Sequence, residues 1–194
     1  MLAAHPDIQV VVHPLDVNDH DQVFTVFAQA AADLGGLDRV IVNAGLGKGG
    51  RIGTGKFFAN KETAETNFIA ALAQCEAAME HFYERKAGHL VVISSMSAMR
   101  GMPSSMTTYA ASKAAVAALA EGIRSDLIGR KGVDIKVTTL FPGYIASEMS
   151  GKVEQGSSSW STPRRGVVPW SRRSSARSPT PPSPPGRGHR WRPS

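Results

Sequence analysis

Residues 89–95, with the sequence His-Leu-Val-Val-Ile-Ser-Ser, are the stretch that decides the fold. The run is apolar at consecutive positions, which is typical of a strand buried on both faces of a sheet. An alanine-rich segment of helical length follows at about residues 105–128, after a loop that contains Gly101 and Pro103. A buried strand followed by a long helix is the repeating unit of a parallel sheet.

The same alternation of strand and helix extends in both directions from this stretch. Further strands are predicted at residues 8–15, 39–43 and 133–140, with a helix that ends at Gly35 and another at about residues 61–85. This order predicts an α/β fold with a doubly wound parallel sheet, covered by helices on both faces. Ligands bind such sheets at the carboxyl ends of the strands. Functional residues are therefore expected directly after Leu15, Val42, Ile93 and Leu140.

Composition limits the class of protein. The 194 residues are 42% apolar and 20% charged, which fits one globular domain and excludes collagen-like and wholly disordered chains. No apolar run approaches the roughly 18 residues of a membrane span, and residues 1–10 do not resemble a signal peptide, so we expect a soluble cytoplasmic protein. The single cysteine, Cys75, allows no internal disulfide and is interpreted as a small residue on a helix face.

The net charge of +6 comes from the last quarter of the chain. Residues 1–150 hold 13 Lys and Arg against 15 Asp and Glu, a net charge of −2, whereas residues 151–194 hold 9 against 1, a net charge of +8. The second segment is rich in Ser, Arg and Pro and lacks any period, so we predict a folded domain over 1–150 and a disordered basic tail over 151–194. Neither a nucleic acid nor a membrane is expected as a partner.

The glycine-rich loop at residues 45–55 contains two partial phosphate-binding motifs. Residues 45–50 match the pattern GxGxxG, and residues 50–56 nearly match a Walker A loop, but Phe57 stands where a Ser or Thr must bind magnesium. Both motifs need a helix that begins where the loop ends, and residues 51–58 show no helix-start pattern. We therefore interpret the segment as a flexible active-site loop.

A stronger candidate site is Tyr109-Ala-Ala-Ser-Lys113, near the start of the helix that follows residues 89–95. Residues four apart share one helix face, and an ammonium group beside a phenol favours the phenolate, which makes the tyrosine a usable proton donor and acceptor. Ser94 and Ser95 end the preceding strand, at the edge where ligands bind. Asn67 lies in an alanine-rich helix where asparagine is a poor choice, which suggests another task for its side chain.

From about residue 15 to residue 149, the chain resembles the short-chain dehydrogenase/reductase family. The resemblance rests on several motifs in the family's order: Asp16-Val17, Asn43-Ala44-Gly45, Asn67, Ser95, Tyr109-x-x-x-Lys113, and Pro142-Gly143 followed by Tyr144-Ile145-Ala146-Ser147. It implies a Rossmann-like fold, an NADP or NAD cofactor with NADP slightly favoured, and hydride transfer between the nicotinamide and an alcohol or carbonyl carbon.

The resemblance also implies a role for each matching residue. Tyr109 would be the general acid and base, Lys113 would favour its phenolate and hold the nicotinamide ribose, Ser95 would bind the substrate oxygen, and Asn67 would hold a water molecule in a proton relay. The cofactor would lie against Asp16, Val17, Asn43, Ala44, Gly45, Pro142, Gly143, Ile145 and Ser147. No metal site is expected. Because Ser95 precedes Tyr109 by one residue more than is usual in the family, Ser94 and Ser97 stay alternatives for the catalytic serine.

The chain departs from the family pattern at both ends. The family's first strand, glycine-rich turn, helix and second strand are absent before Met1, so we expect an incomplete sheet and weak or no cofactor binding. The composition break at residue 150 suggests a shifted reading frame, because codons for Ser158–Arg164 can spell Lys-Phe-Met-Val-Asp-Thr-Ala when shifted by one nucleotide. Intact members are expected to form homo-oligomers. The main alternative function is a non-enzymatic interaction module built from the two long helices and the basic tail.

Overall fold

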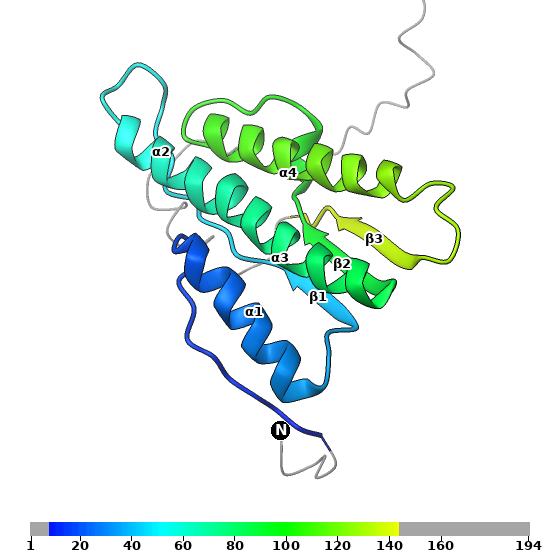
Figure 1. The fold of residues 1–194 in the computed structure, drawn as a ribbon. Helices are drawn as coiled ribbons and strands as arrows, with labels where there is room; N and C mark the ends of the chain where they lie inside the picture. The colour runs from blue at the N-terminus through cyan, green and yellow to red at the C-terminus, as the bar shows by residue number, and fades with distance from the viewer. Residues whose placement is uncertain (1–7, 144–194) are drawn as a thin grey trace, which may run out of the picture. The chain divides into compact units, whose positions relative to one another are not determined.

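The computed structural model describes residues 8–143 of the chain. The chain divides into two units, residues 1–156 and 157–194, and all described residues lie in the first. The expectations for Ile145, for Ser147 and for a tail over residues 151–194 lie outside the described residues. Figure 1 shows the fold of the described part.

A parallel sheet of three strands forms the centre of the described part, in the order β1-β2-β3. The strands are β1 (Arg39–Val42), β2 (Ala87–Ile93) and β3 (Asp134–Leu140). Ile41 pairs with Val91, which pairs in turn with Thr138. The three strands predicted from these segments are confirmed, and so is the α/β class with a parallel sheet.

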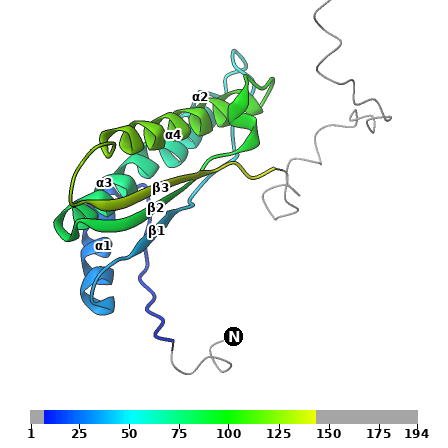
Figure 2. The same cartoon turned by 90° about the vertical axis from the view of Figure 1, so that its right-hand side faces the viewer.

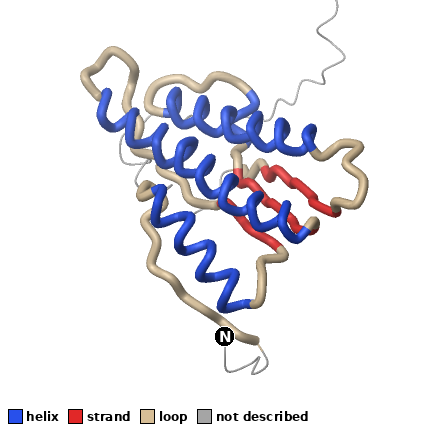
Figure 3. Tube along the Cα trace, in the orientation of Figure 1, coloured by secondary structure: helices blue, strands red, loops and turns tan. Residues whose placement is uncertain are grey.

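Within residues 8–143, four α-helices and two short helical segments connect or precede the strands (Figure 3). The α-helices are α1 (His20–Leu34), α2 (Phe57–Ala64), α3 (Ala70–Arg85) and α4 (Met106–Asp126). A π-helical segment, η2 (Glu65–Ile69), joins α2 directly to α3, and a 3₁₀ turn, η3 (Met96–Met99), follows β2. The helix after β1 is therefore continuous, with one wider turn in its middle.

Helices α3 and α4 lie on the same face of the sheet, and α1 packs against α3 (Figures 1 and 2). Connections between parallel strands are right-handed, and the steps from β1 to β2 and from β2 to β3 run in the same direction across the sheet. Both connecting helices must then lie on one side. Within residues 8–143 no helix covers the opposite face, where Ile41 is 57% exposed.

The core lies between the sheet and α3 and α4. Its largest buried side chains are Phe82, Leu90, Val92 and Val116. Gly88 on β2 faces the ring of Phe82, and a Cβ atom at this position would clash with that ring. The close approach of helix and strand therefore requires glycine here.

The prediction of a strand at residues 8–15 is wrong. The segment is an extended coil, in which Val12 is 84% exposed. His13 pairs with Asp33 at 3.0 Å, so the coil runs along α1 and not beside β1. A β-branched run becomes a strand only where a neighbouring backbone accepts and donates its hydrogen bonds, and residues 8–143 offer it no such partner.

The structure shows how two helices begin, and it corrects the predicted start of the second. Asp19 caps α1, since its carboxylate accepts a hydrogen bond from the Gln22 backbone N–H at 3.1 Å, while Asp16 forms a local turn with Asn18. The helix after the glycine-rich loop begins at Phe57, four residues earlier than predicted, and Lys56 provides no capping hydrogen bond. Without a capping residue, the sequence gives no local signal for this start.

No helix among residues 8–143 is both long and apolar enough to cross a membrane.

Candidate active site

The loop after β1 brings Gly45 against two side chains from distant parts of the chain. A Cβ atom at position 45 would lie 3.4 Å from the Lys113 Nζ atom and 3.6 Å from the Asn67 Oδ1 atom. Asn43, Ala44 and Gly45 follow the carboxyl end of β1, where a parallel sheet places its ligands. The structure thus brings together three of the predicted segments at one edge of the sheet.

Asn67 lies in the π-helical segment η2 and is fully buried. Its side chain pairs with both backbone groups of Leu46, accepting from the N–H at 2.6 Å and donating to the carbonyl at 2.9 Å. It also donates to the Ser112 hydroxyl at 3.0 Å. The asparagine therefore has the separate task that its poor helix propensity suggested, and that task is to fix the loop after β1. The role expected for Asn67 in holding a water molecule stays a prediction.

Lys113 is buried in the second turn of α4, where its ammonium donates to the Ile93 carbonyl at 2.8 Å. Within residues 8–143, Ile93 is the one protein acceptor for this ammonium, which carries three hydrogens. Burial lowers the pKa of Lys113 from its ordinary value. The Ser94 hydroxyl donates to the Lys113 backbone carbonyl at 2.8 Å, so this residue is held at both ends.

Tyr109 lies one helical turn before Lys113 on α4, and its side chain is half-buried. Its backbone carbonyl accepts a hydrogen bond from the Ser112 hydroxyl at 2.8 Å. The i,i+4 spacing and the shared helix expected for the pair are therefore present.

The three candidate serines lie in different environments. Ser94 is buried and donates to the backbone of α4, so its hydroxyl serves the fold. Ser95 begins η3 and is half-buried, and its hydroxyl accepts hydrogen bonds from the Ser97 backbone N–H at 3.2 Å and from the Ser97 hydroxyl at 2.9 Å. Ser95 and Ser97 lie at η3, which packs against α4, and the catalytic role expected for one of them stays a prediction.

The other predicted cofactor residues lie around this centre with fewer contacts. Asp16 is exposed and Val17 is half-buried, and the neighbouring Asn18 side chain accepts a hydrogen bond from the Thr66 hydroxyl at 3.1 Å, beside Asn67. At the end of β3, the Pro142 carbonyl accepts from the Met96 backbone N–H at 3.0 Å, and Gly143 follows it at the exposed surface.

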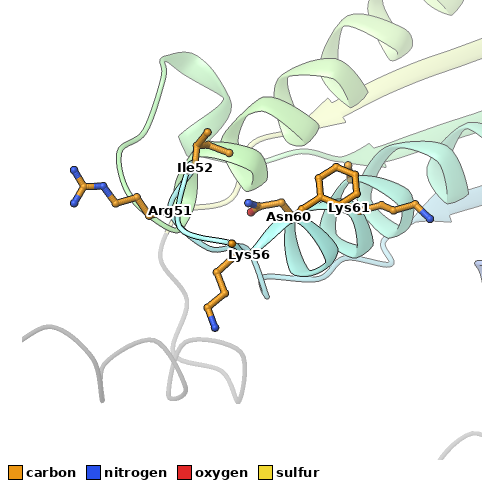
Figure 4. Close-up of a pocket in the computed structure, with 9 residues that line it drawn as sticks. Arg51, Ile52, Lys56, Asn60 and Lys61 are labelled. Carbon is orange, nitrogen blue, oxygen red and sulfur yellow. The ribbon is translucent and has the colours of Figure 1, made fainter.

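The Arg51 and Lys56 side chains at the glycine-rich loop do not converge on one point (Figure 4). A shallow cavity of about 450 Å³ lies beside it, lined by residues that include Arg51, Lys56 and Asn60. The Arg51 and Lys56 side chains point away from Asn60 (Figure 4). Asn60 instead accepts the Gly50 backbone N–H at 2.9 Å and so fastens the loop to α2.

Sequence reasoning missed Ser112 and Asn60 as structural contacts of the site. Ser112 is buried and joins Asn67 to α4. The one sequence signal for this contact was its position between Tyr109 and Lys113 in the motif. Asn60 had a signal of the same kind as Asn67, because asparagine is a poor choice inside a helix. The predicted late start of that helix placed Asn60 in a loop instead.

Comparisons with known proteins agree with this geometry. The family model described as short chain dehydrogenase matches residues 2–158. An uncharacterised oxidoreductase of Mycobacterium tuberculosis is 53% identical over 148 residues, which cover 76% of this chain and 57% of that protein. An uncharacterised oxidoreductase of Myxococcus xanthus is 34% identical over 143 residues, or 73% of this chain and 55% of that protein.

Solved structures show the same likeness. A short-chain dehydrogenase from Streptomyces avermitilis has a TM-score of 0.66 at 26% identity, over 76% of this chain and 53% of that one. The structure of ElxO with NADP bound has a TM-score of 0.65 at 27% identity, and the match covers 74% of this chain and 57% of that one. The chain belongs to the short-chain dehydrogenase family, and it spans little more than half the length of these relatives. Membership of an oxidoreductase family does not favour the alternative of a non-enzymatic helix module.

Proposed function

We propose that the chain carries the catalytic half of an NAD(P)-dependent oxidoreductase that interconverts an alcohol and a carbonyl compound. The observation that carries the proposal is the buried Lys113 ammonium, which lies beside Gly45 and Asn67 and one helical turn from Tyr109. Burying a cation costs free energy, and an apolar residue would stabilise helix α4 better at a position that is only 4% exposed. A lysine at this position therefore suggests a functional role.

The residues around Gly45 fit a nicotinamide nucleotide. Glycine leaves open the space that a Cβ would fill between Lys113 and Asn67, and the ammonium has two hydrogens beyond the one that Ile93 accepts. Ribose hydroxyls are suitable acceptors for these hydrogens. In this proposal Lys113 holds the ribose, and Gly45, Ala44 and Asn43 lie beneath the cofactor. When bound, the cofactor supplies or accepts the hydride at the substrate carbon.

The chain's own residues handle the proton and the substrate oxygen. In the direction of reduction, the Tyr109 hydroxyl gives its proton to the carbonyl oxygen, and the same group accepts it back in the direction of oxidation. The Lys113 ammonium stabilises the phenolate that remains, because opposite charges attract strongly where water is excluded. The Ser95 hydroxyl orients the substrate oxygen, and Asn67 keeps the loop under the cofactor in place.

Several finer points belong to the same proposal. NADP is favoured over NAD, and NADP is the nucleotide bound in the ElxO structure, which is 27% identical to this chain over the aligned part. The partners are small molecules together with further copies of the chain, and the compartment is the cytoplasm. In this proposal Asp16, Val17, Pro142 and Gly143 lie around the cofactor. Pro142 and Gly143 follow the carboxyl end of β3, and Asp16 and Val17 precede Asn18, which pairs with Thr66 beside Asn67.

The proposal is tested with the tyrosine. Tyr109→Phe removes one oxygen atom, and we expect it to abolish nearly all turnover of NADPH or NADH with a panel of ketones and aldehydes, followed by nicotinamide absorbance. Tyr83→Phe is the matched control, since Tyr83 lies on α3, half-exposed, beneath the Arg130 guanidinium and away from the site. Turnover in the Tyr109 variant within a few-fold of the parent chain would remove the proposed role.

A further inference from the structure

We propose that Ser112 is a positioning residue, whose hydroxyl sets the register between helix α4 and the loop that lies under the proposed cofactor site. This inference rests on the proposed function above. It concerns how Tyr109 and Lys113 are held, and Ser112 itself touches neither substrate nor cofactor in it.

The contacts of Ser112 join three segments that are far apart in the chain. Its hydroxyl donates to the Tyr109 carbonyl at 2.8 Å and accepts from the Asn67 side-chain amide at 3.0 Å. Asn67 lies on η2, 45 residues earlier in the chain, and its amide holds both backbone groups of Leu46. Ser112 and Asn67 are 6% and 0% exposed, so water does not compete for these bonds.

The donor and acceptor roles along this chain of hydrogen bonds can run in one direction only. The Leu46 N–H can only donate and its carbonyl can only accept, which fixes the orientation of the Asn67 amide. The amide nitrogen then faces Ser112, so the serine oxygen must accept. Its own hydrogen must go to the Tyr109 carbonyl, which can only accept. Position 112 therefore needs one group that both donates and accepts, within a buried and fully paired network.

The neighbouring residue fastens the same turn of α4 to the sheet. The Lys113 carbonyl accepts from the Ser94 hydroxyl, and its ammonium donates to the Ile93 carbonyl, both at 2.8 Å. Ser112 and Lys113 thus tie one helical turn to η2 and the Leu46 loop on one side and to β2 on the other. Without the Ser112 bond, the sheet contact would remain while the loop contact was lost. The distance between Gly45 and the Tyr109–Lys113 pair would then no longer be fixed from both sides.

The test measures hydrogen exchange of the Leu46 amide by NMR in the cofactor-free chain. In Ser112→Ala the Asn67 amide loses its hydrogen bond to α4, so the Leu46 loop is held to the helix less firmly, and we expect the Leu46 amide to exchange roughly fivefold faster or more, while the Leu90 amide in the core is unchanged. Ser125→Ala is the matched control. Ser125 lies on the same helix and donates to the Glu121 carbonyl at 2.9 Å, but it is exposed and joins no other element.

A second variant keeps the test decisive if Ser112→Ala does not fold. Ser112→Cys has a similar shape and a weaker donor and acceptor, and we expect an intermediate increase in Leu46 exchange. Unchanged Leu46 exchange in a folded variant overturns the inference. An equal increase at Leu90 also overturns it, because the effect would then be a general loss of stability.

Turnover separates this inference from the proposed function. In an active parent chain, we expect Ser112→Ala to lower kcat by roughly tenfold with a smaller change in KM, and Ser125→Ala to change neither. If Leu46 exchange rises and kcat does not fall, the positioning role is wrong. If the parent chain has no turnover with either nicotinamide nucleotide, the proposed function fails for this chain, and the positioning role of Ser112 in catalysis fails with it. Hydrogen exchange of the Leu46 amide still decides whether Ser112 joins α4 to the loop.

Discussion

Asn67→Asp changes one atom group at the centre of the candidate site and gives a sharp quantitative expectation. The new carboxylate can still accept from the Leu46 N–H, but it replaces the amide nitrogen that donates to the Leu46 carbonyl at 2.9 Å and to Ser112 at 3.0 Å. Two hydrogen bonds at about 1 kcal/mol each are lost. A carboxylate is also buried at a position with no exposure, and the Lys113 ammonium near Gly45 offsets only part of its desolvation cost, so we expect a loss of unfolding free energy of about 2–4 kcal/mol at neutral pH.

The loss should depend on pH. We expect burial to raise the pKa of the introduced carboxyl above its ordinary value of about 3.9, because the cost of desolvating the charged form outweighs the opposing attraction of the Lys113 ammonium. Between these two pKa values the unfolded chain is ionised while the folded chain stays neutral, so the variant loses stability as the pH rises through this window. Near pH 4 the neutral carboxyl can still donate one hydrogen bond, and we expect a loss of only about 1–2 kcal/mol.

The assay is urea unfolding of the 194-residue chain, followed by far-ultraviolet circular dichroism near pH 4 and near pH 7. Asn43→Asp is the matched control, since it makes the same change of charge at an exposed residue of the same loop. If Asn67→Asp costs no more stability than Asn43→Asp at neutral pH, or if its cost does not change with pH, the closed hydrogen-bond network around Asn67 is refuted.

Two further predictions concern buried titratable groups. Because burial lowers the pKa of Lys113 below its ordinary 10.5, the folded chain releases this proton at a lower pH than the unfolded chain, and the free energy of unfolding should rise with pH between the folded and unfolded pKa values. This rise should be absent in Lys113→Met and present in Lys136→Met, the control at an exposed site. If the free energy of unfolding depends on pH in the same way in both variants, the prediction is wrong. Burial, with a smaller contribution from Glu76, raises the pKa of Cys75 to about 12. We therefore expect Cys75 not to react with a thiol reagent near pH 8 until urea unfolds the chain. The free energy of unfolding should also fall as the pH rises from 9 toward 12, because the thiol ionises at a lower pH in the unfolded chain. Rapid stoichiometric labelling of the folded chain that is absent in Cys75→Ser would contradict this, because it would show that the thiol is accessible.

Local sequence signals determined the elements that carry the site. The short apolar segments of β1 and β2 and the β-branched segment of β3 predicted parallel strands, and Gly35 ends α1 in the left-handed conformation (φ +74°) that favours glycine. The spacing of Tyr109 and Lys113 placed both on one helix face. These features depend on residues within a few positions of one another, so the sequence contains them.

The tertiary structure decided which of these residues meet and which local preferences are overridden. The β-branched run at residues 8–15 has the composition of a strand, yet without a neighbouring backbone it lies along α1 as a coil. The Ser94 hydroxyl donates to the backbone of α4, whereas the Ser95 and Ser97 hydroxyls pair with each other, and the sequence contains no signal for these contacts. The link from Leu46 through Asn67 to Ser112 spans three segments, and only packing brings them within hydrogen-bonding distance.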